Sequence, residues 1–161
     1  MEIDKLLKEE LIIDDLSATT KEEVLEQMAD YLYKRGYVKD SFKDAILKRE
    51  KFYPSGLPMP GEKIAIPHTD AEHVNSSTLL FARLKSPVTF SVMGAPEQTM
   101  EVRLISMFAL KEKREIGALL ETLLTTYQDE ALLSRLAEAP SGLEIYSLLH
   151  GAVGAQLEAR A

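Results

Sequence analysis

Ser77-Thr-Leu-Leu-Phe-Ala-Arg-Leu84 decides the fold class, because so short and apolar a run is typical of a buried strand. A second buried strand is predicted by another short apolar run, Val102-Arg-Leu-Ile-Ser-Met-Phe-Ala-Leu110. Shorter strands are expected at 11–13, 63–68 and 88–92. Segments with apolar residues at helical spacing lie between and after these strands, and this alternation predicts an α/β fold.

The first helix is expected to begin after Thr20, because Thr20 and Glu23 have the spacing of a capping box. A second begins near residue 40 or 41, and more follow residue 112, the last of them capped by Ser141. No internal repeat or linker interrupts the pattern. We therefore expect one domain over 1–150 and a C-terminal tail, 151–161, that frays.

Composition excludes several classes of function. The chain has 161 residues and a net charge of −7, which argues against binding to nucleic acid or to anionic lipid. It contains no cysteine, which excludes disulfides, thiol catalysis and thiolate metal sites. The sequence shows no membrane-spanning run and no export signal at its start, so we expect a cytoplasmic protein without direct membrane insertion.

A long loop is expected from residue 52 to residue 62, because three prolines and two glycines forbid regular structure there. Long loops inside compact domains are usually functional or disordered. His68 follows this loop at the end of a short strand, after Pro67. Side chains at strand ends in α/β domains often build a site. His68 is thus a candidate base, ligand or nucleophile, or an ordinary strand-end residue.

The other two histidines have simpler interpretations. His150 is expected at a helix C-terminus, where its charge is favourable. His73 is interpreted as a solvated loop residue. A zinc site built from His68, His73 and Asp70 or Glu72 is the alternative, although no helix is predicted there to align the two rings.

The stretch Ile64-Ala-Ile-Pro-His68-Thr, preceded by Arg49-Glu-Lys-Phe-Tyr-Pro-Ser-Gly-Leu57, resembles a known family. This family comprises the enzyme IIA domains of the fructose–mannitol class, in the bacterial phosphoenolpyruvate-dependent sugar phosphotransferase system. These flanks, together with His73-Val-Asn-Ser-Ser77, resemble the galactitol-type, free-standing members. The resemblance extends over residues 5–150 and implies a mixed β-sheet flanked by helices.

The resemblance also implies roles for individual residues. His68 would be the phosphorylated nucleophile, since the histidine of this motif carries the phosphoryl group in the family. Arg49 would clamp the phosphate, a task for which its planar fork suits it. Taken alone, Arg49 would be a surface helix residue paired with Glu50 or a neighbouring acid. Thr69 offers a hydroxyl and a backbone N–H as support, or is a solvent-facing turn residue.

One position departs from the family. Many members carry a second histidine at the start of the helix after the last long strand, and Glu115 stands at roughly that place here. A carboxylate cannot donate a hydrogen bond to phosphate. Glu115 therefore either orients His68 by accepting its other ring proton, or is an ordinary acid in a first helical turn.

The resemblance implies a phosphotransferase component that needs neither cofactor nor metal. It would accept a phosphoryl group from HPr and pass it to enzyme IIB, which serves the membrane enzyme IIC, for uptake of a galactitol-like sugar or polyol. The alternative in the same fold is a regulatory protein similar to the nitrogen-related enzyme IIA. An unrelated alternative is a metal-dependent hydrolase that uses His68 and His73.

Four residues of the loop are expected to form an apolar rim for partner docking or to pack on the core: Phe52, Tyr53, Leu57 and Met59. The acidic net charge would complement the basic residues that flank the histidine of HPr.

Overall fold

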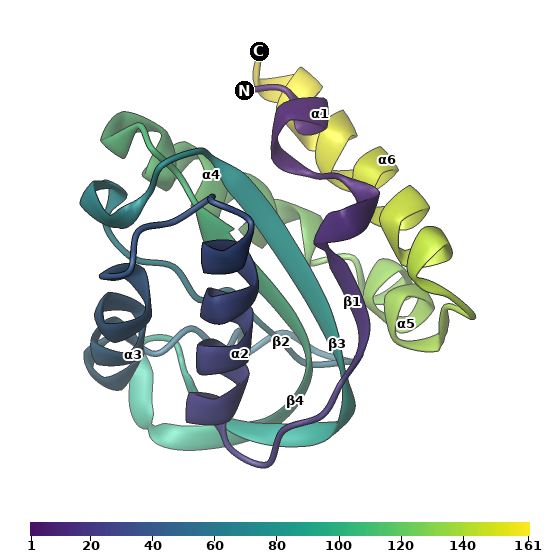
Figure 1. The fold of residues 1–161 in the computed structure, drawn as a ribbon. Coiled ribbons are helices and arrows are strands. Elements are labelled where there is room, and N and C mark those ends of the chain that lie inside the picture. The colour runs from purple at the N-terminus through teal and green to yellow at the C-terminus, as the bar shows by residue number, and fades with distance from the viewer.

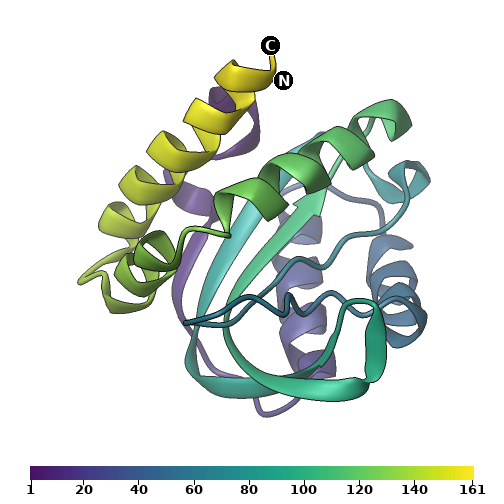
Figure 2. The same cartoon turned by 180° about the vertical axis from the view of Figure 1, so that it is seen from behind.

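A four-stranded sheet with strand order β1-β3-β4-β2 organises the computed structural model, which describes residues 1–161. The long strands β3 (Thr78–Val92) and β4 (Ala95–Ala109) pair antiparallel. β1 (Ile12–Leu16) pairs with β3, and β2 (Ile64–Ala65) pairs with β4, both in parallel. The sheet is therefore mixed and carries helices on both faces (Figure 1, Figure 2), which confirms the predicted fold class.

The two central strands form one hairpin, closed at Gly94, whose φ is +80°. The prediction of a separate strand at 88–92 is wrong, because these residues continue β3 beyond a register shift between Arg83 and Val88. The residues at 85–87 are exposed, and Pro87 has no N–H to donate. They interrupt the apolar run in the sequence without ending the extended chain.

Two helices, α2 (Lys21–Lys34) and α3 (Phe42–Phe52), cover one face of the sheet (Figure 1). The Thr20 hydroxyl caps α2 by accepting from the Glu23 N–H at 3.2 Å, as predicted. The Glu23 carboxylate accepts from the N–H and the hydroxyl of Thr19, not from the Thr20 N–H of a standard capping box.

Three helices, α4 (Lys113–Thr126), α5 (Glu130–Glu138) and α6 (Gly142–Arg160), cover the opposite face (Figure 2). Asp129 caps α5, and Ser141 caps α6 as predicted. None of the helices combines the length and the apolar character that a membrane span needs.

The remaining helical elements are short. A four-residue helix, α1 (Ile3–Leu6), lies beside α6 near both chain ends (Figure 1). Two 3₁₀ turns, η1 (Glu9–Leu11) and η2 (Ala71–His73), lead into β1 and toward β3 respectively. The second turn positions His73 close to α3.

Side chains of β3 alternate between two cores. Leu79 and Phe81 pack with α4, α5 and α6, whereas Leu80 and Ala82 pack with α2 and α3. All four are fully buried, which explains why β3 appears in the sequence as a continuous apolar run. The sheet thus separates two cores of similar size and holds its central strands rigidly between them.

The tail expected to fray is helical. α6 continues past Gly151 to Arg160, because Val153 and Leu157 extend its buried side and α1 packs against it. His150 therefore lies within the helix and not at its C-terminus, and its Nε2 is 2.6 Å from Oδ1 of Asp4. Gly151 does not end the helix, since this tertiary packing outweighs the low helix propensity of glycine.

The proline-rich loop after α3 packs tightly on the sheet at Gly56. The Gly56 N–H donates to Ser91 O at 3.1 Å, and Gly56 O accepts from the Met93 N–H at 2.7 Å. A Cβ on Gly56 would lie 2.6 Å from Ser91 O, a distance that only glycine avoids. The loop is thereby fixed to the end of β3 before it reaches β2.

We expect Gly56→Ala to lower the free energy of unfolding by about 1–3 kcal/mol, because the added methyl collides with the Ser91 carbonyl. Urea denaturation measures the change. Gly151→Ala is the matched control: no atom lies within 4 Å of its added Cβ, so it should stabilise α6 by up to about 1 kcal/mol. Equal effects of the two variants would contradict the close approach at Gly56.

Candidate active site

His68 lies just beyond β2, where the backbone leaves the sheet after Pro67. The N–H of Phe108 on β4 donates to Pro67 O at 3.2 Å and so extends the pairing of the two strands. The Phe108 ring stacks under the imidazole, with centroids 4.6 Å apart and planes 12° apart. Sheet pairing and stacking together fix the position of the histidine ring.

The ring nitrogens of His68 have different roles. Nδ1 lies 3.0 Å from Ile66 O. A carbonyl oxygen only accepts hydrogen bonds, so Nδ1 carries the proton and Nε2 keeps its lone pair. Burial lowers the pKa of His68, and the nearby Arg49 charge lowers it further against the opposing effects of Ile66 O and Asp70. The lowered pKa favours a neutral imidazole, whose Nε2 keeps a free electron pair.

A pocket of about 200 Å³ opens at His68. Arg49 and Tyr53 reach it from the C-terminal end of α3, and Leu120 reaches it from α4. The Arg49 guanidinium carbon lies 5.2 Å from the centroid of the Tyr53 ring. The structure therefore brings Arg49 and His68 together in one cavity, although they are 19 positions apart in the sequence.

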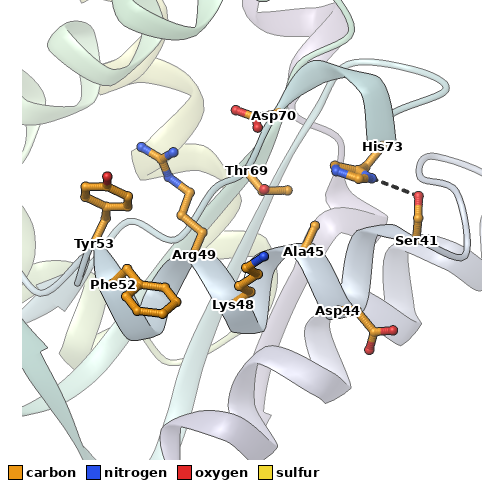
Figure 3. A pocket seen from close by; sticks show the side chains of 10 residues that line it. All are labelled: Ser41, Asp44, Ala45, Lys48, Arg49, Phe52, Tyr53, Thr69, Asp70 and His73. Atoms are coloured by element: carbon orange, nitrogen blue, oxygen red, sulfur yellow. Dashed lines mark hydrogen bonds between the residues drawn. The ribbon is translucent and has the colours of Figure 1, made fainter.

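Figure 3 shows a second pocket, of about 470 Å³. Arg49 and Tyr53 line both this pocket and the one at His68. Thr69 is buried and lines this second pocket, and it is absent from the lining of the His68 pocket. His73 lines the same wall, and its Nδ1 is 2.8 Å from Ser41 Oγ on the α3 side (Figure 3).

The alternative metal site is not assembled. His73 bonds to Ser41, and its Nε2 is 3.6 Å from Glu72. No group of three or more histidine, aspartate or glutamate side chains is arranged to hold a metal ion. The interpretation of His73 as a solvated loop histidine also needs correction, because its side chain is only 20% exposed.

Glu115 lies in the first turn of α4 and is absent from the lining of the His68 pocket. It forms neither a hydrogen bond nor an ion pair with His68, whose Nδ1 already bonds to Ile66 O. α4 reaches the pocket through Leu120 instead, more than one turn further along the helix.

Sequence reasoning missed the role of Glu50, which is only 4% exposed. Its two carboxylate oxygens accept from the Ser55 N–H at 2.8 Å and the Ser55 hydroxyl at 2.7 Å. It forms no ion pair with Arg49, contrary to the pairing considered from sequence. A signal was present: Glu50 follows Phe42 and Ile46 at four-residue spacing, on the buried side of α3.

Two aromatic residues form an exposed rim beside the pocket. Phe52 and Tyr53 are 61% and 67% exposed. Of the two alternatives left open for the four loop residues, packing on the core holds for Leu57, which is buried, and for Met59. The rim therefore consists of the two aromatic side chains at the end of α3.

This arrangement suits attack on an anionic electrophile. Nε2 of His68 supplies an electron pair, and Arg49 supplies a planar cation with several N–H donors in the same cavity. Phosphoryl transfer needs mainly such positioning and charge neutralisation. The pocket therefore has the groups required to form a phosphohistidine.

Comparison with known proteins also relates the chain to phosphoryl transfer. Residues 5–151 match the family described as "Phosphoenolpyruvate-dependent sugar phosphotransferase system, EIIA 2". The chain is 33% identical over 137 residues to the mannitol-specific EIICBA component of Escherichia coli, covering 83% of this chain. The chain spans 20% of that longer relative. It is 26% identical over 125 residues to the galactitol-specific EIIA component of E. coli, covering 78% of this chain and 83% of the relative.

Solved structures share the fold. The complex of mannitol enzyme IIA with phosphorylated enzyme IIB from E. coli matches with a TM-score of 0.73 and 30% identity. The match covers 90% of this chain and 97% of the other. The nitrogen regulatory protein IIA-Ntr from Neisseria meningitidis matches with a TM-score of 0.71 and 22% identity, over 91% of this chain and 97% of the other. At that identity the second match shows the fold alone.

Glu50→Gln is expected to remove a pH dependence of stability. Burial raises the pKa of Glu50 from 4.5 to about 7. The folded protein therefore binds this proton more tightly than the unfolded chain. The free energy of unfolding then falls as the pH rises between these values, by about 3 kcal/mol in total.

The check is urea denaturation of wild type and variant from pH 4.5 to pH 8, taken as a difference curve in which other groups cancel. Glu138→Gln, at an exposed position on α5, should leave the wild-type slope unchanged. If the full slope survived in Glu50→Gln, a different group would have to titrate.

Proposed function

The chain belongs to the type 2 enzyme IIA family of the phosphoenolpyruvate-dependent sugar phosphotransferase system, and we propose that it carries the phosphoryl group on His68. The observation that supports this most is the hydrogen bond from His68 Nδ1 to Ile66 O beside Arg49. It leaves Nε2 unprotonated in a cavity that already holds a cation.

The proposed step is an in-line exchange between two imidazoles. The Nε2 electron pair of His68 forms a bond to phosphorus while the bond from phosphorus to the histidine of phospho-HPr breaks. The electron pair of the broken phosphorus–nitrogen bond returns to the HPr ring. Nδ1 of His68 keeps its proton, which stays hydrogen-bonded to Ile66 O. Arg49 balances the charge of the equatorial oxygens during the exchange. Thr69 would support Arg49 from the adjoining pocket, whereas Glu115 has no part that the geometry favours.

We propose HPr as the donor and an enzyme IIB as the acceptor, which in turn serves a membrane enzyme IIC. The similar mannitol enzyme IIA is solved in complex with phosphorylated enzyme IIB, which supports the acceptor. Phe52 and Tyr53 offer exposed aromatic area next to the pocket, as a small and transient interface requires. Since phosphoenolpyruvate is made in the cytoplasm, the proposal places the carrier there.

The transported compound is proposed to be a sugar or polyol. Among these compounds we propose galactitol, because the match with this chain extends over 83% of the length of the galactitol-specific component. The mannitol relative is more identical but much longer. Regulation by phosphorylation, as in the nitrogen-related protein, has support only from a shared fold. Growth of a carrier-deleted strain on galactitol, mannitol and fructose, with this chain supplied, distinguishes the sugars.

His68→Ala should abolish phosphorylation by phosphoenolpyruvate, enzyme I and HPr, because the variant lacks the nucleophilic Nε2. Intact-protein mass spectrometry should show one acid-labile phosphoryl group on the wild type and none on the variant. His73→Ala is the matched control and should be labelled like the wild type, since His73 does not line the His68 pocket. Labelling of the His68 variant would refute the assignment.

Arg49→Lys should slow acceptance from phospho-HPr by roughly 10- to 100-fold, the effect of losing one charge-assisted hydrogen bond to phosphate. The net charge is kept, but a point charge replaces the planar fork. Rapid-quench kinetics measures the rate. Arg35→Lys at the end of α2 is the control, because Arg35 stacks on Tyr31 away from the pocket. A rate equal to that of the control would remove Arg49 from the phosphate site.

A further inference from the structure

The strongest unassigned feature is the buried carboxylate of Glu50 in the last turn of α3. It lines the same pocket as His68, yet both of its oxygens face Ser55 rather than the cavity's cation. Burial of a carboxylate is unfavourable unless hydrogen bonds compensate it. Glu50 is buried beside His68 and bonds through both oxygens to one residue of the adjoining loop, which indicates a role beyond packing.

A continuous series of hydrogen bonds connects Glu50 to His68. Glu50 holds Ser55, and the Ser55 carbonyl oxygen accepts a hydrogen bond from the Ile66 N–H at 3.0 Å. The carbonyl of Ile66 then accepts from Nδ1 of His68, also at 3.0 Å. Ile66 is thus bonded through its N–H to the segment that Glu50 holds, and through its oxygen to the reactive ring.

Glu50 holds Ser55 from the α3 side, whereas on the other side of Ser55 the Leu57 N–H donates to Ile64 O at 2.9 Å. Pro54 has no N–H to donate. The Tyr53 N–H donates to Arg49 O in the last turn of α3, and the Tyr53 side chain is exposed. Gly56 is bonded to the end of β3, on the far side of Ser55. Without Glu50, the buried N–H and hydroxyl of Ser55 would both lose their partners, at a cost that favours movement of the segment.

We propose that Glu50 is a positioning residue: through Ser55 it holds Ile66 so that the Ile66 carbonyl fixes the tautomer and orientation of His68. The inference rests on the proposed function of His68 as the phosphoryl acceptor. In this proposal the Glu50 side chain on α3 determines which ring nitrogen of His68, beyond β2, carries the proton. Glu50 itself touches neither the donor nor the phosphoryl group.

Four variants test the coupling. Glu50→Ala removes both bonds to Ser55, Glu50→Gln keeps an acceptor for the Ser55 N–H, and Ser55→Ala removes the hydroxyl alone. The matched control is Asp129→Ala, which removes another acid that accepts from a backbone N–H, at the start of α5. Circular dichroism and urea denaturation establish that each variant is folded and how much stability it has lost.

The first readout is nitrogen-15 NMR of the His68 ring, which reports the tautomer and pKa without any phosphoryl donor. Wild type, Glu50→Gln and Asp129→Ala should show the Nδ1–H tautomer. Glu50→Ala should show a mixture of tautomers, and Ser55→Ala a smaller change in the same direction. A pure Nδ1–H tautomer in folded Glu50→Ala, or in Ser55→Ala if the former does not fold, would overturn the proposal.

The second readout is the rate of acceptance from phospho-HPr. Glu50→Ala should be slower by about tenfold or more, because a wrong tautomer presents no lone pair at Nε2, and Glu50→Gln should restore most of the rate. Slowing in Asp129→Ala equal to that in Glu50→Ala would mean that lost stability alone explains the effect. If wild type is never labelled, the proposed function fails, while the NMR result still decides the role of Glu50.

Discussion

The antiparallel pairing of β3 with β4 is the constraint on which the rest of the structure depends. β4 offers one edge to β3 and the other to β2, so the short strand before His68 has a partner only because the hairpin exists. The same pairing brings Phe108 beneath the imidazole. At the far end of β3, Ser91 anchors Gly56 and so fixes the loop after α3. Two segments of little regular structure thereby acquire fixed positions around one pocket.

Electrostatics in that pocket follow from burial more than from ion pairing. Desolvation lowers the pKa of His68 and raises that of Glu50, so both groups are biased toward their neutral forms. Arg49 strengthens the effect on His68 and forms no ion pair with a carboxylate. A cation beside a neutral imidazole is the arrangement that the proposed acceptance of a phosphoryl group requires. Pairing of Arg49 with Glu50 would have cancelled much of this advantage.

Local sequence signals succeeded where local forces decide the outcome. The caps at Thr20 and Ser141 formed as predicted, because a side-chain oxygen and an N–H three residues later meet in any helix start. The apolar runs of β3 and β4 became buried strands. The expectation of a helix end near Gly151 failed because a distant contact decides there: α1 packs along α6. The sequence left open whether Leu57 joins the rim or packs on the core, and the inward course of the loop decided it.

For the site, the sequence by itself determined which residues are chemically suited: a histidine after a proline, an arginine on the preceding helix and a loop that cannot be regular. It also determined the family, which matches residues 5–151. Only the tertiary structure decided that Nδ1 faces Ile66 O, that Glu50 turns to Ser55, and that Leu120 and not Glu115 lines the pocket. Tautomers, buried charges and cavity walls depend on distances between segments remote in the chain, and those distances are set by packing across the sheet.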